Sequence, residues 1–332
     1  MLMVEERCRR VVSATESKSD TETALLDCFK MAARSGLVRL VRFAVESPVW
    51  IWPGCLPSMA VESVLTAAVE GKQLEILRLT EGVCKNRFGL SASIFSRVVL
   101  RASAEFGFLE GLEKEFDRGG DGDGGRQVSA LKERLCADAA KGGQLETLRV
   151  LREKRKCGWG KEVVERASVM GHCQIVRYAA LQGCPFLATE TLANLAFACA
   201  VARSERQESE ILGTFRWVFA TVAAVRDGER GRARTSSSSS RSPANAIDPR
   251  GGLELTQVWA TAAHWGADMI LHWAAEQPED VVPPESLFSA SVRERAKRGR
   301  KKEIADWLLE MSKKRGQRVI ERDDERIEHE GE

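Results

Sequence analysis

Few of the residues that could carry chemistry stand at spacings that form a site. The chain has four histidines and nine cysteines. A zinc site needs paired ligands such as Cys-x₂₋₄-Cys or His-x₃₋₅-His, and neither pairing occurs in the sequence. No order of Cys, His and Asn indicates an activated nucleophile either. The sequence therefore predicts no metal, no cofactor and no enzymatic activity.

A glycine-rich segment from Asp117 to Gly125, DRGGDGDGG, invites two functional interpretations. A calcium loop needs oxygen ligands at alternate positions, but glycine stands at position 125, two residues after Asp123. A phosphate loop needs Gly-Lys-Ser/Thr, but Gly125 is followed by Arg126 and Gln127. We interpret the segment as a linker.

Composition limits the class of protein. Hydrophobic residues make up 43% of the chain, charged residues 30%, and the net charge is +2. This charge is too small to indicate nucleic-acid binding over the whole surface. Unpatterned cysteines favour a reducing compartment, and Glu5 and Glu6 stand where a signal peptide needs apolar residues. We expect an intracellular monomer, cytoplasmic rather than nuclear, without membrane segments.

A short phrase recurs along the chain: two small residues, two variable ones, a glycine, and an apolar-acid-apolar run. The copies are AARSGLVRLVRF from Ala32, AVEGKQLEILRL from Ala68, SAEFGFLEGLEKEF from Ser103, AAKGGQLETLRVL from Ala139, ASVMGHCQIVRY from Ala167, AAHWGADMILHW from Ala262 and RAKRGRKKEIADWL from Arg295. One register position falls at Val38, Leu74, Leu109, Leu145, Cys173, Asp268 and Lys302. The successive spacings are 36, 35, 36, 28, 95 and 34 residues. Such a period indicates a repeat architecture.

The phrase is typical of two helices joined by a tight turn. In the fourth copy Leu131, Leu135 and Ala139 recur at helical spacing and form one apolar stripe. Gly142 and Gly143 can then supply the left-handed conformation that ends a helix. A second amphipathic helix follows from Leu145. One such pair cannot bury its apolar stripe alone, so the pairs must stack.

The phrase resembles the ankyrin repeat. Gly171-His172 followed by Gln174-Ile175-Val176 is similar to the middle of that repeat, and this resemblance implies a structural role for His172. The tetrapeptide 183–186, Gly-Cys-Pro-Phe, resembles the repeat ending of a divergent ankyrin group, and Cys157-Gly158-Trp159 resembles a worn copy. The likeness covers roughly residues 21–315. It departs from the family pattern in lacking Thr-Pro-Leu-His openings and in placing Lys72 where glycine is expected.

The sequence thus predicts an all-α fold, a solenoid of about seven or eight degenerate ankyrin-like helix pairs. The array is expected at residues 21–225 and 253–315. It is interrupted at 226–252 by a disordered Ser/Arg-rich insertion. Residues 1–20 and the charged tail 316–332 are expected to be unstructured. Within 189–225 we predict a sixth repeat, whose two helices join through a polar turn at residues 203–208.

The resemblance implies a protein–protein interaction scaffold that binds a partner on its concave face. In ankyrin repeats the variable residues before the turn glycine commonly touch the partner. The matching residues here are Arg34, Ser35, Glu70, Glu105, Phe106, Lys141, Val169, Met170, His264, Trp265, Lys297 and Arg298. Phe106, Met170 and Trp265 are the expected anchors, because exposed large apolar groups beside charges are typical of interfaces.

Two other functions stay open. Lys301-Lys302 and Lys313-Lys314-Arg315 have the spacing of a bipartite nuclear import signal. The C-terminal basic face could therefore belong to a nuclear or nucleic-acid-binding adaptor, although we do not expect nucleic acid as the partner. The other alternative is an enzyme-associated regulatory subunit.

Overall fold

The computed structural model describes residues 18–46, 57–87, 92–118, 125–232 and 254–314. These residues form helices and turns, and no strand is assigned among them. The all-α prediction is therefore confirmed for the described part of the chain. The chain divides into two compact units, residues 1–158 and residues 159–332, which are described separately.

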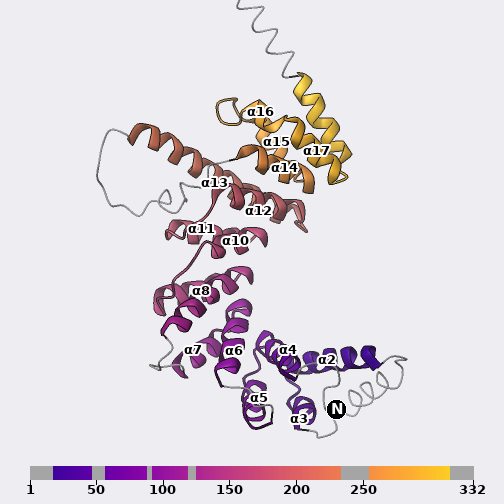
Figure 1. The fold of residues 1–332 in the computed structure, drawn as a ribbon, viewed down its shortest axis with the longest axis vertical. Helices are drawn as coiled ribbons and strands as arrows, with labels where there is room; N and C mark the ends of the chain where they lie inside the picture. The colour runs from indigo at the N-terminus through magenta and orange to yellow at the C-terminus, as the bar shows by residue number, and fades with distance from the viewer. Residues whose placement is uncertain (1–17, 47–56, 88–91, 119–124, 233–253, 315–332) are drawn as a thin grey trace, which may run out of the picture. The chain divides into compact units, whose positions relative to one another are not determined.

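Unit 1 consists of helix pairs that follow one another along the chain (Figure 1). Its helices are α2 (Lys18–Arg34), α3 (Val38–Glu46), α4 (Pro57–Glu70), α5 (Leu74–Arg87), α6 (Ala92–Phe106), α7 (Leu109–Arg118), α8 (Gly125–Lys141) and α9 (Leu145–Arg149), which continues as the π-helical turn η1 (Val150–Lys154). The first helices of the pairs, α2, α4, α6 and α8, pack on one another in that order. Each also packs on the second helix of its own pair.

Unit 2 repeats this arrangement (Figure 1). Its helices are α10 (Glu162–Val169), α11 (Cys173–Leu181), α12 (Ala188–Ala200), α13 (Glu205–Arg232), α14 (Leu255–Trp265), α15 (Asp268–Glu276), the short α16 (Pro284–Leu287), α17 (Ala290–Arg298) and a last helix at 302–314. Here α10, α12, α14 and α17 are the first helices, and they pack successively. Four helix pairs are thus found among the described residues of each unit.

The small residues predicted to lie near the ends of the first helices are buried. Ala33, Ala104, Ala140 and Ala263 have no exposed surface, and Ser103 and Ser168 are equally buried. Short side chains at these positions let neighbouring first helices approach closely. The two small residues of the recurring phrase are therefore needed for the close packing of neighbouring first helices.

An aromatic cluster forms the centre of unit 2. Phe215 and Phe219 of α13 contact Trp259 and Trp273, with ring centroids 5.4–6.2 Å apart. Trp259 is fully buried. Three other tryptophans, Trp217, Trp273 and Trp307, lie on second helices of their pairs, and all three are only half-buried. Trp259 is buried more completely because it lies on a first helix, α14, which packs against α12, α15 and α17. The rings of Phe215 and Phe219 also lie against it.

The predicted sixth repeat falls on a helix pair, α12 and α13, whose connection contains no left-handed residue. Helix α13 begins at Glu205, so residues 205–208 of the predicted polar turn are helical. A capping box begins α13: the Gln207 amide donates to the Ser204 hydroxyl (3.3 Å), and the Arg203 amide donates to the Gln207 side-chain oxygen (3.2 Å). Ser and Gln three residues apart are the sequence signature of this device, which the sequence analysis overlooked.

Two predicted boundaries need correction. Helix α13 continues to Arg232, so residues 226–232 are helical and do not belong to a disordered insertion. Arginine and glutamate in this stretch are good helix formers, which outweigh its two glycines. Helix α2 likewise begins at Lys18, within the region expected to be unstructured. The remainder of the predicted insertion, 233–252, the linker residues 119–124 and the tail 316–332 lie outside the described residues. Among the described residues, no helix is long and apolar enough to cross a membrane.

Candidate functional site: the ends of the first helices

Seven of the first helices end in the same way. A residue with left-handed backbone, φ between +56° and +89°, stands two positions before each register residue: Gly36, Lys72, Gly107, Gly143, Gly171, Gly266 and Arg300. At every one of these turns the next amide donates to a carbonyl five residues earlier, over 2.8–2.9 Å. This is the hydrogen bond of a Schellman motif. Its recurrence confirms the register predicted from the sequence, and Lys72 and Arg300 adopt the glycine conformation without being glycine.

We call the residue before each left-handed residue the proximal end position, and the residue before that the distal end position. The distal positions hold Arg34, Glu70, Glu105, Lys141, Val169, His264 and Arg298. The proximal positions hold Ser35, Gly71, Phe106, Gly142, Met170, Trp265 and Gly299. All the predicted partner-binding residues except Lys297 occupy these positions. Lys297 lies one residue too early, because the turn follows Arg300 and not Gly299.

Three proximal glycines permit close contact between neighbouring first helices. A Cβ atom on Gly71 would lie 2.0 Å from the Arg34 carbonyl oxygen, and one on Gly142 would lie 1.7 Å from the Glu105 carbonyl oxygen. In unit 2 a Cβ on Gly299 would lie 2.0 Å from the His264 carbonyl oxygen. Each glycine thus presses on the distal position of the preceding pair. No other residue type fits this contact without moving the backbone.

In unit 1 the distal side chains bind one another. Arg34 forms an ion pair with Glu70 of the next helix pair. Lys141 pairs with Glu105 of the preceding helix pair, over 2.8 Å. Four of the predicted partner-binding residues are therefore joined in intramolecular pairs, a pairing that the sequence analysis did not anticipate.

The expectation that Phe106 is an exposed anchor is wrong. Phe106 is half-buried and packs against the hydrophobic core of unit 1. Its neighbour Gly107 lies against the Gln144 side chain of the next pair, and that amide also donates to the Gly142 carbonyl oxygen over 3.0 Å. Packing against the core of unit 1 accounts for the buried part of the Phe106 side chain.

In unit 2 two of the three proximal positions hold large, exposed side chains, and the third is Gly299. Met170 is 49% exposed and Trp265 is 44% exposed. The Trp265 indole meets the Phe197 ring edge-on, with centroids 4.8 Å apart, and lies 5.0 Å from the His264 ring. His264, which is half-buried, lies with Nδ1 3.3 Å from the Arg295 carbonyl oxygen. Trp265 is therefore held in place on one side and available on the other.

A groove of about 450 Å³ extends from Trp265 between α14 and α17. It is lined by polar side chains, among them Thr256, Gln257 and Thr261 of α14 and Ser291 and Arg295 of α17. The sequence analysis missed these residues. Their spacing of four, from Gln257 to Thr261 and from Ser291 to Arg295, is a signal for one polar helix face. That two such faces border one groove depends on the packing of α14 against α17.

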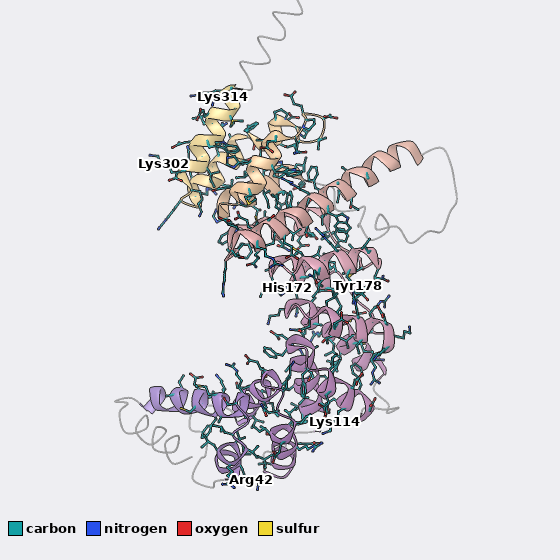
Figure 2. All side chains as sticks on the ribbon, turned by 180° about the vertical axis from the view of Figure 1, so that it is seen from behind. Arg42, Lys114, His172, Tyr178, Lys302 and Lys314 are labelled. Atoms are coloured by element: carbon teal, nitrogen blue, oxygen red, sulfur yellow. The ribbon has the colours of Figure 1, made fainter. Side chains whose placement is uncertain are left out.

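Positive charge borders the same groove. The stretch 295–302, RAKRGRKK, contains six basic residues and no acidic one. Within the described part of the chain, Arg298 pairs with Glu294 (3.5 Å), but no ion pair involves Arg295, Lys297, Arg300, Lys301 or Lys302. The Lys301 ammonium lies beside Gly266, since a Cβ there would be 2.9 Å from Nζ. Figure 2 shows Lys302 and Lys314 at opposite ends of the last helix.

Three buried thiols have shifted pKa values among the described residues. Among the described residues, no group of three or more His, Cys, Asp or Glu side chains could hold a metal ion. Burial raises the pKa of the Cys199 thiol to about 12 and also raises the pKa of Cys173. A hydrogen bond with Cys136 lowers the pKa of Cys157, although both thiols are fully buried. Buried thiols of this kind are usually inert.

The remaining residues singled out in the sequence are structural. Half-buried His172 precedes α11, and its amide closes the turn on the Ala167 carbonyl (Figure 2). Cys157 and Cys184 are both fully buried, and each follows a left-handed residue, Lys156 or Gly183. The two turns share a left-handed residue but differ in their hydrogen bonds: the Cys157 amide donates to the Leu151 carbonyl, six residues earlier, and the Cys184 amide donates to the Ala179 carbonyl, five residues earlier. Comparisons with protein-family models, with curated proteins and with solved structures found no match to this chain.

Proposed function

We propose that this chain is a protein-interaction scaffold whose units are arrays of ankyrin-like helix pairs. The recurring Schellman turn, the buried small residues and the successive packing of first helices support an ankyrin-like solenoid within each unit. The proposed activity is the binding of a partner protein, and no catalytic step is assigned to the chain.

One observation carries the proposal of binding. Met170 and Trp265 occupy the same proximal end position of their helix pairs and expose nearly half of their surface. A regular backbone that repeatedly presents one position to solvent is suited to partner binding. Large apolar or aromatic residues are the usual anchors of such surfaces.

Site-specific photo-crosslinking in the native cell tests this function. A photoreactive phenylalanine derivative would replace Met170 or Trp265, and, as a matched control, Leu181, which is 52% exposed at the end of α11. We expect one partner protein to crosslink from positions 170 and 265 and not from position 181. Absence of any adduct from the first two positions, or the same adducts from all three, would contradict the proposal.

Substitutions with alanine provide the complementary test. Met170→Ala and Trp265→Ala should each release the crosslinked partner while the melting temperature of the chain stays nearly unchanged, because these side chains are half outside the core. Leu181→Ala should retain the partner. A large loss of stability without loss of binding would instead mark both residues as packing residues.

A further inference from the structure

The surface around Trp265 combines three features: an exposed indole, a polar groove and a basic turn. These are Trp265 itself, the groove between α14 and α17, and the residues 295–302. We call them together the Trp265 surface. We propose that the Trp265 surface binds an acidic peptide segment of the partner protein, with one apolar side chain of that segment placed on the indole. This inference rests on the proposed scaffold function and names the chemistry of its ligand.

The charges around the turn support an acidic ligand. Elsewhere in the same register the cations are neutralised within the chain: Arg34 pairs with Glu70, and Lys141 pairs with Glu105. Among the described residues, the turn offers no comparable pairing for Arg300, Lys301 or Lys302. Exposed like charges concentrated in one turn repel one another, and carboxylates of a ligand would relieve that repulsion.

The indole supports an apolar contact within that acidic ligand. Trp265 is fixed by the edge-on contact with Phe197 and by His264, so little side-chain freedom remains to be lost on binding. A rigid, half-exposed tryptophan is a typical binding anchor. The hydroxyl groups of Thr256, Thr261 and Ser291 along the groove can hydrogen-bond to an extended peptide backbone.

The same features favour a peptide over a nucleic acid. Glu254 lines the groove, and Asp268 is exposed just beyond Trp265. Both carboxylates would repel phosphates and ligand glutamates alike, but a peptide can place uncharged residues beside them, whereas a nucleic acid carries a phosphate at every nucleotide. The basic residues lie within residues 295–302, from the end of α17 to the start of the last helix, whereas nucleic-acid binding usually follows a longer track of cations. A short acidic segment matches the extent of the positive charge.

A direct binding assay tests the inference with the full chain. The probe is a fluorescein-labelled synthetic peptide in which glutamates flank one central leucine, and the readout is fluorescence anisotropy at low salt. We expect saturable binding that weakens about tenfold when the leucine is replaced by serine. Replacement of the glutamates by glutamine should abolish it. Tighter binding of an oligothymidylate than of the peptide would overturn the proposal and assign the surface to nucleic acid.

Matched charge reversals locate the site. The Lys301→Glu and Lys302→Glu double variant should bind the peptide about tenfold more weakly. The control is Lys313→Glu with Lys314→Glu, which makes the same charge change at the other end of the last helix (Figure 2) and should bind within about twofold of the native chain. Equal loss in both double variants would show a general charge effect and overturn the assigned site.

The aromatic contact is tested separately. Trp265→Ala should weaken peptide binding about tenfold, and Trp265→Phe should recover part of that loss. Circular-dichroism melting checks that each variant is folded, and the exposed lysine variants remain informative if Trp265→Ala fails to fold. Peptide binding that does not change with Trp265→Phe or with the 301/302 reversal would refute the proposal.

Two further outcomes separate this inference from the proposed function and from another occupant. A partner that crosslinks at position 265 while the native chain has no affinity for the acidic peptide would leave the scaffold function standing and overturn the acidic-ligand inference. Residues 321–332, ERDDERIEHEGE, are themselves rich in acid. A variant with glutamine and asparagine in place of the acidic residues of 321–332 tests whether this segment occupies the surface. If the peptide binds only to that variant, the Trp265 surface is assigned to residues 321–332, and the proposal of a separate partner is overturned.

Discussion

Unit 1 and unit 2 end their first helices with the same turn, but they use the neighbouring side chains differently. In unit 1 the distal end positions form two ion pairs, Arg34 with Glu70 and Glu105 with Lys141. The two pairs are related by a shift of 71 residues in the sequence, with the charges exchanged. In unit 2 the corresponding surface carries exposed Trp265 beside unneutralised cations. The same Schellman turn therefore forms with different side chains at the end positions.

The cores of the two units differ as well. Unit 1 is built mainly from valine, leucine and alanine, such as Val64, Leu65 and Ala68, with a few phenylalanines around them. Unit 2 contains the four-ring cluster around Trp259. The difference teaches that a shared turn geometry does not require a shared core, because the turn depends on local backbone hydrogen bonds. The following predictions test how far this comparison holds.

The largest effect should come from the aromatic core of unit 2. Trp259→Ala should lower the free energy of unfolding by about 4 kcal/mol, because it removes a fully buried ring. Thermal or urea unfolding followed by circular dichroism measures this loss. Trp217→Ala, at a half-buried position on α13, should cost clearly less. Equal losses at both positions would show that the cluster is not the centre of unit 2.

Close stacking in unit 1 gives the next effect. Gly142→Ala would place a methyl group against the Glu105 carbonyl oxygen, so we expect a loss of about 3 kcal/mol in the free energy of unfolding. The matched control is Gly82→Ala in α5, where a Cβ meets nothing within 4 Å. This control should gain about 0.5 kcal/mol, since alanine favours a helix interior more than glycine does. A tolerated Gly142→Ala would remove the packing argument for the proximal glycines.

Replacement of Lys72, a left-handed residue of unit 1, by glycine should instead raise the free energy of unfolding. Lys72 has φ of +56°, a conformation that costs a residue with a Cβ about 1 kcal/mol. Lys72→Gly should therefore raise the free energy of unfolding by up to about 1 kcal/mol, less the extra chain entropy of glycine. Lys72→Ala keeps the Cβ and should show no such gain. A similar gain with alanine would attribute the effect to the lysine charge.

The smallest effect concerns the ion pairs that distinguish unit 1. Glu105→Lys alone should cost about 0.5 kcal/mol, because the pair with Lys141 is partly exposed and screened by water. Adding Lys141→Glu should restore the loss by recreating the charge order of Arg34 and Glu70. Unfolding measured at low and high salt checks this, since salt should remove the difference. A double variant no better than the single one would show that the charges do not interact.

Much of the local structure could be predicted from the sequence. The helix pairs, their register and the sixth pair followed from the spacing of small residues, glycines and apolar stripes, since these patterns report backbone conformation within a few residues. Even Lys72 kept the register in spite of its missing glycine. The end of α13 at Arg232 was missed, because a helix terminus depends on weak propensities that a charged, glycine-containing stretch leaves nearly balanced.

Tertiary structure decided whether the side chain at each end position is exposed or packed. Phe106 and Trp265 look alike in the sequence, each being an aromatic residue before a turn glycine, yet Phe106 packs on the core and Trp265 stays open. The pairing of Arg34 with Glu70 also required contact between residues 36 apart. By itself the sequence determined where the turns fall, because a Schellman turn depends on local backbone geometry. Which side chains remained exposed at those turns depended on how neighbouring helix pairs packed, and that is a contact between residues distant in the sequence.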